Sequence, residues 1–558
     1  MGLRELGAVY SRAVLGALMV AGLAGLLIWL SAAGKPIYTD EVAFFRDFRL
    51  VARGDFAGLQ IPHPPLYTAL GGIAVTFFDE GPLALRLPGL LGFWAAVLMV
   101  PPVCLAIAPD IRTSQRAALL ALLVFAFHPQ VLQGALILDI DNTILPAALL
   151  LLVVTVGLSE GWTARRQAVA IGAAFWLLLW TKVLPTPAIA AVCLLAVASL
   201  TPSRFRPIVG GLSLGAVAWA ASFGLFLVIS SGNLTVYLST VARGSQALRI
   251  EQLAGRLAMG GGIQVFWIGL PLVVLGVVAV GETLRRFVLT RDNFVAAWLA
   301  LLVTVGLIVT TLGNELPMGF PRYQTPLIWL AVPLIASWVA RHAWPEDWRF
   351  VGLLAAGLAI ALWLVVRDPL LPNYQLTMVT DSATQRLLVG ARVSLVAMVL
   401  PLAIAIAATL VVVGRRPRAL VSAVLATSLA LWTVTTAAQA VAQYATGYEY
   451  GRIGGWEAGM AIASAPSGTI IAPLELVYSS GRDGQFIYDF LDAGGLDRLL
   501  ERLDREPPAA FAYSVKEERR FPAVFESPAL HERLAACYGS PRRIGSYVVY
   551  LRSSASIC

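Results

Sequence analysis

Apolar runs of about 20 residues recur along most of this chain, and this feature limits its fold more than any other. Of the 558 residues, 58% are hydrophobic and only 13% are charged. The mean hydropathy is +0.76, which is more apolar than a water-soluble protein can bury. Because the bilayer interior offers no water, each run must satisfy its backbone hydrogen bonds as a helix. We therefore expect a polytopic α-helical membrane protein.

The apolar runs predict about thirteen transmembrane helices. They cover residues 13–33, 84–108, 116–135, 143–158, 167–181, 184–200, 207–230, 260–281, 293–313, 321–340, 349–366, 390–413 and 419–441. The first run is long enough to span, so we expect no cleavable signal peptide. The apolar segment from Pro64 to Phe78 is short for a span, and we expect it to lie at the outer face as a juxtamembrane helix.

Every second loop between these spans is rich in arginine, so these loops all fall on one side of the membrane. The positive-inside rule makes that side cytoplasmic. The net charge of +8 is therefore a topology signal and gives no reason to expect a nucleic-acid partner. The arginines concerned are Arg4, Arg12, Arg112, Arg116, Arg165, Arg166, Arg204, Arg206, Arg285, Arg286, Arg291, Arg341, Arg349, Arg415, Arg416 and Arg418.

The odd number of spans places the chain after about Gln443 on the outer side. Its composition is that of a soluble domain, with "GTIIAP", "AAFAYSV" and "SYVVYLR" as short strands between helical stretches. We divide the chain into a transmembrane domain, 1–442, and a small extracytoplasmic α/β domain, 443–558. In an oxidising compartment Cys537 and Cys558 could form a disulfide, whereas Cys104 and Cys193 lie in apolar runs.

Two acidic pairs lie on the predicted outer side, close to the membrane. Asp40 and Glu41 directly follow the first span, and Asp139 and Asp141 belong to the loop "LDIDN". Charge at this depth is costly and usually functional. Carboxylates on adjacent loops can take a proton from a hydroxyl or bind a divalent cation. The structural alternative is that each pair caps a helix N-terminus or solvates a loop.

Cations that the positive-inside rule disfavours share this side: Lys35, Arg46, Arg49, Arg53, His63, Arg86, Lys182 and Arg322. Such a group suits a phosphate head group. An unpaired ammonium would be costly for Lys182, which lies between two apolar runs, so we expect a phosphate or a carboxylate partner. The alternative is a lysine that extends to the interface from a helix end. For His63 the alternative is a purely structural hydrogen bond.

Six motifs occur in order: "TDEVAFFRDFRLVARGDF", "HPPLY", "GPLALRLPGLLGFW", "LDIDN", "WTKVLP" and "GFPRYQTPLIWLAVP". Over about residues 1 to 340 this series resembles the GT-C glycosyltransferases that use polyprenyl-phosphate sugars. The group includes the protein O-mannosyltransferases and the aminoarabinose transferases that modify lipid A. His63 stands where aminoarabinose transferases have a lysine, and this difference argues against aminoarabinose as the sugar.

The resemblance implies an inverting transfer of one sugar from polyprenyl phosphate on the outer face of a bacterial cytoplasmic membrane. The acceptor, a lipid, polysaccharide or protein of the envelope, stays open. Asp40 matches the proposed catalytic base, Glu41 its neighbour, and Asp139 or Asp141 the second-loop carboxylate. The residues expected near the donor phosphate or sugar are Arg46, His63, Lys182, Arg322 and Tyr323. Metal dependence stays open; a divalent cation would be held by Glu41, Asp139 and Asp141.

Two other functions fit the composition. One is a transporter or flippase for a lipid-linked sugar, and the other is a non-catalytic envelope scaffold. Transporters place charges near the bilayer midplane and often contain repeated halves. Here the charges gather at one face and the halves of the sequence do not repeat, which favours the enzyme.

Overall fold

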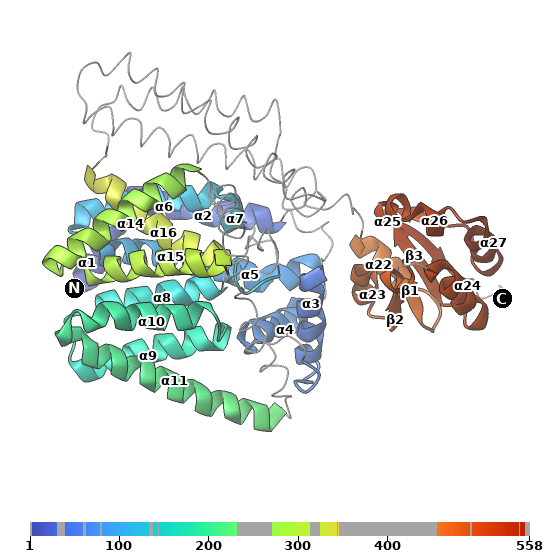
Figure 1. Cartoon of the computed structure of the whole chain (residues 1–558), viewed down its shortest axis with the longest axis horizontal. Coiled ribbons are helices and arrows are strands. Elements are labelled where there is room, and N and C mark those ends of the chain that lie inside the picture. The colour runs from blue at the N-terminus through green and yellow to red at the C-terminus, as the bar shows by residue number, and fades with distance from the viewer. Residues whose placement is uncertain are drawn as a thin grey trace, which may run out of the picture. The chain divides into compact units, whose positions relative to one another are not determined.

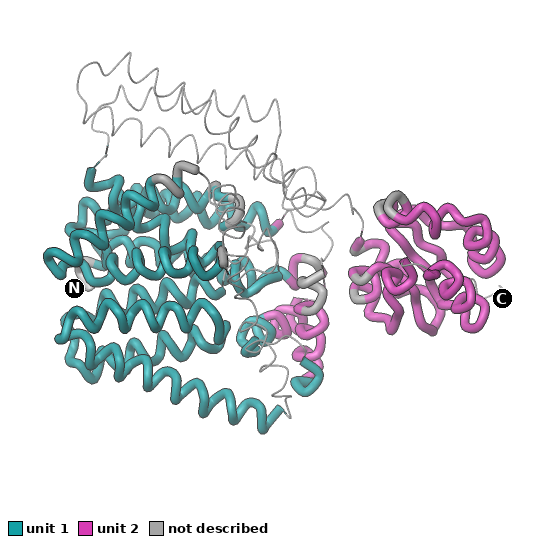
Figure 2. The backbone as a smooth tube through the Cα atoms, in the orientation of Figure 1, with its two compact units in different colours: residues 1–29, 55–70, 86–444 teal, residues 30–54, 71–85, 445–558 magenta. Residues whose placement is uncertain are grey.

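The structure is a computed structural model that describes residues 3–30, 39–59, 63–78, 81–132, 138–142, 144–230, 270–312, 324–342, 344, 455–491, 494–545 and 547–552. The chain forms two compact units (Figure 2). Unit 1 comprises Met1–Trp29, Asp55–Leu70 and Arg86–Tyr444. Unit 2 comprises Leu30–Gly54, Gly71–Leu85 and Ala445–Cys558.

Unit 1 consists mainly of a helical bundle (Figure 1). Each predicted span up to 321–340 contains a helix, and the spans 349–366, 390–413 and 419–441 lie outside the described residues. The helices are α1 (Leu3–Val9), α2 (Arg12–Leu30), α5 (Pro82–Ile107), α6 (Ile111–Phe127), α7 (Pro129–Leu132), α8 (Ile144–Leu158), α9 (Ala164–Thr181), α10 (Thr186–Ser199), α11 (Pro202–Ser230), α14 (Leu270–Thr290), α15 (Phe294–Leu312) and α16 (Thr325–His342).

By length and composition alone, three of the described helices can cross a membrane: Arg12–Leu30, Leu83–Ile107 and Pro202–Ser230. Shorter apolar helices accompany them, among them Ile144–Leu158 and Thr186–Ser199. The molecule is therefore a helical membrane protein, and the number of thirteen spans stays a prediction.

Helices α9 and α11 pack closely because glycines line their contact. A Cβ atom added at Gly215 would lie 2.6 Å from the carbonyl oxygen of Gly172, and one at Gly211 would lie 2.8 Å from the side chain of Ile171. Gly211 and Gly215 have the four-residue spacing of the small-residue motif that lets membrane helices approach closely. The contact fixes α9, the helix that ends directly before Lys182.

Aromatic side chains fill the centre of the bundle. The ring centroid of Trp329 in α16 lies 4.2 Å from that of Phe125 and 6.0 Å from that of Phe93. The buried indole of Trp298 in α15 donates a hydrogen bond to the carbonyl oxygen of Ala190 in α10. These contacts join helices that are far apart in the sequence, and they set the relative positions of α5, α6, α10, α15 and α16.

Helix α3 (Thr39–Ala52) carries the predicted site residues Asp40, Glu41 and Arg46, and helix α4 (Leu66–Phe78) begins three residues after His63. They approach closely because a Cβ atom at Gly71 would lie 2.3 Å from the Phe48 ring, and one at Gly72 would lie 2.4 Å from Val51. The segment predicted as a juxtamembrane helix is thus helical from Leu66. Its place at the outer face stays a prediction.

The C-terminal residues form a five-stranded sheet in the order β2-β1-β3-β5-β4. Strand β1 runs parallel to β2 and β3, whereas β5 runs antiparallel to β3 and β4. Strands β1, β3 and β5 coincide with the three predicted strand segments. The elements are α22 (Gly455–Ala463), β1 (Ile470–Ala472), α23 (Leu474–Ser480), β2 (Gly484–Phe486), η6 (Ile487–Phe490), α24 (Gly495–Arg505), β3 (Ala510–Ser514), α25 (Val515–Arg520), α26 (Pro522–Phe525), α27 (Pro528–Cys537), β4 (Arg542–Ile544) and β5 (Tyr547–Leu551).

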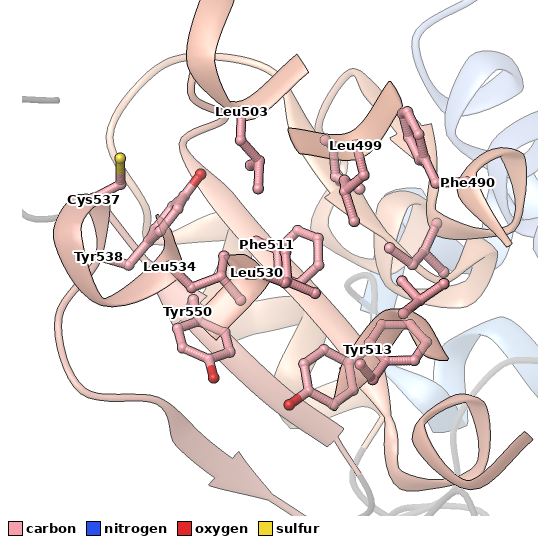
Figure 3. Close-up of a cluster of buried hydrophobic side chains, with 14 residues drawn as sticks. Phe490, Leu499, Leu503, Phe511, Tyr513, Leu530, Leu534, Cys537, Tyr538 and Tyr550 are labelled. Atoms are coloured by element: carbon pink, nitrogen blue, oxygen red, sulfur yellow. The ribbon is translucent and has the colours of Figure 1, made fainter. Parts of the chain in front are cut away.

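Each face of this sheet buries its own apolar core. Figure 3 shows one, in which Phe511, Tyr513 and Tyr550 pack with Leu499 and Leu534. The core of the other face includes Ile470, Ala510, Tyr547 and Val549 of the strands with Ala458 and Ile462 of α22.

The cysteines divide as their surroundings suggested. Cys104 and Cys193 are free and buried, whereas Cys537 at the end of α27 is disulfide-bonded. Cys558, its predicted partner, lies outside the described residues.

Candidate functional site

The loop "LDIDN" enters α8 as a tight buried turn. The Asp139 carboxylate accepts a hydrogen bond of 2.7 Å from the backbone N–H of Asp141. This bond between a carboxylate and the backbone two residues later is the usual device by which Asp forms a turn. Asp139 and Asp141 are only 3% and 5% exposed, so both predicted carboxylates lie inside the bundle.

Lys182 follows the last residue of α9 and points its ammonium at this loop. Its Nζ lies 2.6 Å from Oδ1 and 2.7 Å from Oδ2 of Asp141. Lys182 is 4% exposed. Of the two partners predicted for this lysine, the structure shows the carboxylate, and the burial excludes a lysine that extends into solvent. Removing either member of a buried ion pair leaves the other charge buried without a partner, which destabilises the fold. Each of the two residues therefore needs the other.

A second contact joins the same loop to α16. The Thr325 hydroxyl donates a hydrogen bond of 3.0 Å to Oδ1 of Asn142, and both side chains are buried. Among the described residues, Asn142 Nδ2 and Gln324 Oε1 are buried without a hydrogen-bond partner. Arg322 and Tyr323 lie outside the described residues, but the chain leads from them directly into Gln324 and Thr325.

The arginine-rich loops meet at the opposite end of the bundle. Arg204 forms an ion pair with Glu160, which follows α8, and its guanidinium lies 4.7 Å over the ring of Phe294. The Arg116 guanidinium lies 4.9 Å over the ring of Trp344, which follows α16. Because α8 and α16 begin at the acidic loop and end at the arginine-rich loops, the two sets of loops lie at opposite ends. This arrangement is the one that the predicted topology requires.

Asp40 and Glu41 lie in the first turn of α3, and their side chains are outside the described residues. Carboxylates in the first turn also stabilise a helix through its dipole, so this placement fits the structural alternative as well. Arg46, predicted to bind the donor, lies 2.6 Å from the carboxylate of Asp47. Asp47 is fully buried and escaped the sequence analysis. It follows Asp40 by seven residues, which places both on one helix face.

His63 and Asp55 belong to the chain between α3 and α4, and Arg86 belongs to α5. His63 is half-buried directly before the buried Pro64 and Pro65. Asp55 is exposed and accepts a hydrogen bond of 3.1 Å from the backbone N–H of Gly58, as a turn residue does. Arg86, in α5, is almost fully buried at 1% exposure.

Two of the three ligands predicted for a divalent cation, Asp139 and Asp141, already have other partners in this structure. Both carboxylate oxygens of Asp141 are bound by the Lys182 ammonium, and Asp139 Oδ1 accepts from the backbone. The Glu41 side chain lies outside the described residues. Within the described ranges, no group of three or more His, Cys, Asp or Glu residues is placed to hold a metal ion.

Comparisons with known proteins place the fold. No protein-family model matches the sequence, and no curated protein matches it either. Among solved structures, ArnT from Cupriavidus metallidurans bound to undecaprenyl phosphate is similar, with a TM-score of 0.61 over 97% of this chain and 99% of the other. Its apo structure gives a TM-score of 0.58 over 98% and 100% of the two chains. Sequence identity is 16% in both comparisons, so the likeness concerns the fold. ArnT is a lipid A aminoarabinose transferase of the GT-C superfamily, the group that the sequence motifs of this chain resemble. Over nearly its whole length, the chain has the fold of ArnT.

Proposed function

We propose that this protein is an integral membrane glycosyltransferase that moves one sugar from a polyprenyl-phosphate donor to an envelope acceptor. The observation that carries the proposal is the buried Lys182–Asp141 pair at the end of the bundle opposite the arginine-rich loops. Charge buried at that depth is expensive and is usually functional. The similar ArnT structure is bound to undecaprenyl phosphate, which supports a polyprenyl phosphate as the lipid carrier.

In the proposed reaction, the acceptor hydroxyl attacks the anomeric carbon of the donor sugar. Asp40 takes the hydroxyl proton as the new carbon–oxygen bond forms. The bond between the anomeric carbon and the phosphate oxygen breaks, and polyprenyl phosphate leaves with the electron pair. Attack from the side opposite the leaving group inverts the anomeric configuration.

The leaving phosphate gains negative charge, which a cation in a low-dielectric site stabilises strongly. We assign this task to Lys182 and Arg322, with Tyr323 beside them, and Asp141 holds the Lys182 ammonium in position. Arg46, fixed by Asp47, and His63 are assigned to the donor, and Glu41 supports Asp40. Residues 1–442 would form the catalytic domain, and residues 443–558 an extracytoplasmic α/β domain in a bacterial cytoplasmic membrane.

Turnover by the purified protein tests the proposal. The protein in nanodiscs is incubated with undecaprenyl-phosphate sugars and envelope extracts, and undecaprenyl phosphate and glycosylated products are measured by mass spectrometry. Comparison of envelope glycans from cells with and without the gene identifies the sugar and the acceptor. Movement of intact lipid-linked sugar across proteoliposomes, without release of undecaprenyl phosphate, would instead identify a flippase.

A further inference from the structure

A cavity of about 600 Å³ opens at one end of the C-terminal sheet. It lies where the end of α22, the loop between α27 and β4, and the end of β5 come together. Its polar lining consists of Arg542, Arg552, Ser464 and Ser540, and its apolar lining includes Ala465 and Leu551. Among the described residues that line it, two are arginines and none is acidic.

The pairing of β4 with β5 explains why one arginine of a neighbouring pair reaches this cavity. Arg542 lies opposite Val549, whose side chain belongs to the core beneath α22. Residues directly opposite in an antiparallel pair share a face of the sheet. Arg543 lies opposite Val548, which packs against the core of the other face. The two neighbouring arginines are therefore on opposite faces, and only Arg542 lines the cavity.

The walls of the cavity are held by several contacts. The Arg552 guanidinium donates a hydrogen bond of 3.3 Å to the carbonyl oxygen of Pro507. The backbone of Arg552 forms an antiparallel β-bridge with that of Tyr538. On the other wall, the Arg482 guanidinium donates to the carbonyl oxygens of Ala463 and Ala465, which end α22. The cavity is thus framed by fixed backbone, and this lowers the cost of ordering it around a ligand.

The lining selects ligands by charge. A guanidinium presents its donors in a planar fork that matches a phosphate or a carboxylate. Serine hydroxyls can bond the remaining oxygens of the same group or those of a sugar ring. The volume lies within the range of about 300–1,000 Å³ that is usual for small-molecule sites.

We propose that this cavity binds the anionic group, phosphate or carboxylate, of a sugar in the acceptor. The assignment to the acceptor rests on the proposed transferase function, because the donor phosphate is assigned to Lys182 and Arg322. The acceptor class would accordingly be an acidic glycan or a phosphorylated glycolipid.

Calorimetric titration of the full-length protein in detergent tests the proposal, with glucose 1-phosphate, glucuronic acid and glucose as probes. We expect binding of one or both anionic sugars and no measurable binding of glucose; the two anions distinguish a phosphate site from a carboxylate site. Arg542→Gln should weaken the binding by about 10-fold or more, the effect of losing a charge-assisted contact. Arg543→Gln, with the same change of charge on the opposite face, should stay within about twofold.

Glucose binding as tight as that of the anionic sugars would overturn the proposal, as would an absence of binding by both anions. Equal losses in the two variants would show a diffuse charge effect and would also overturn it. Arg552→Gln provides a second variant should Arg542→Gln unfold. The titration needs no donor, so an absence of binding by the anionic sugars leaves the transferase proposal intact. Binding of the anionic sugars by a protein that shows no turnover of polyprenyl-phosphate sugar counts against the transferase proposal alone.

Discussion

The ion pairs at the two ends of the helical bundle differ in how far they are exposed to solvent. At the arginine-rich end, the Glu160 side chain that pairs with Arg204 is 61% exposed. At the acidic end, the Lys182 and Asp141 side chains are 5% and 6% exposed. An exposed pair contributes about 0–1 kcal/mol, whereas breaking a buried pair costs about 3–5 kcal/mol. The exposed pair at the first end therefore contributes little to stability, whereas the buried pair at the second end must be kept intact for the fold.

The largest effect should come from Asp40→Asn. This change keeps the shape and removes the proposed base, so turnover should fall by roughly 10²–10⁴-fold with little change in donor affinity. Asp55→Asn, at an exposed turn that follows α3, is the control and should keep turnover. A folded Asp40→Asn protein with turnover close to that of the wild type would leave Asp40 and Glu41 as helix-stabilising residues.

Lys182→Met should have the next largest effect. It leaves the Asp141 carboxylate buried without its ammonium, and unfolding in detergent should show a loss of about 3–5 kcal/mol. Donor affinity should fall as well, by about 1.5–3 kcal/mol for one charge-assisted contact. The double variant Lys182→Met with Asp141→Leu should recover much of the stability, because it removes both charges.

Donor affinity in this double variant distinguishes a structural role of the Lys182–Asp141 pair from a role in phosphate binding. If it recovers together with stability, the pair is structural and the phosphate is bound elsewhere. Arg165→Ala at the exposed, arginine-rich end is the control, and we expect it to leave both donor affinity and stability within about 0.5 kcal/mol of the wild type.

Thr325→Val should have a smaller effect, because it breaks a hydrogen bond between two uncharged side chains, Thr325 and Asn142, beside the Lys182–Asp141 pair. It leaves the buried Asn142 oxygen without its donor, so we expect a loss of about 1–3 kcal/mol in the free energy of unfolding. Thr304→Val is a matched control, since the Thr304 hydroxyl bonds only the carbonyl oxygen of Ala300 within its own helix among the bonds observed. Equal destabilisation by both variants would contradict a special role for the Thr325 contact.

The smallest effect should come from Asp110 at the arginine-rich end, where it caps α6. Hydrogen bonds from the backbone and the hydroxyl of Thr113 lower the pKa of Asp110 below its ordinary value. Asp110→Ala should cost about 1 kcal/mol near neutral pH. Because the folded pKa is the lower one, this contribution exists above the ordinary pKa and is lost as the pH falls through the folded value. Unfolding midpoints of wild type and variant should therefore converge below about pH 4, and a constant difference would contradict the cap.

The comparison also shows which parts of the structure the sequence predicts. Helix positions follow from apolar runs, because a run must become a helix in a bilayer whatever its neighbours are. Helix ends depend on local chemistry: the helix expected to reach residue 135 ends at Phe127, because Pro129 disfavours a helical backbone at His128. Helix α14 continues beyond the predicted end at 281 to Thr290, through charged residues that apolarity does not detect.

The site was predicted less completely because its contacts are not local. The burial cost of Lys182 predicted a partner, but Asp141 lies 41 residues away, and only the packing of α8 against α9 selects it. The contact between Thr325 and Asn142 spans 183 residues and leaves no local pattern. For Asp47 the sequence does carry a local pattern, because the spacing of Phe44, Phe45 and Phe48 marks an apolar face of α3, and the structure buries all three.

The Lys182–Asp141 pair has a consequence for how the chain enters the membrane during its synthesis. Asp141 lies three residues before the start of α8 and Lys182 directly follows α9, so both charges lie at the open end of one helical hairpin. In the proposed orientation this end must be carried across the bilayer. Two separate helices would each carry a charge through the apolar layer, where an isolated charge is costly. Inserted together, α8 and α9 carry a neutralised pair, so biogenesis should favour their entry as one unit.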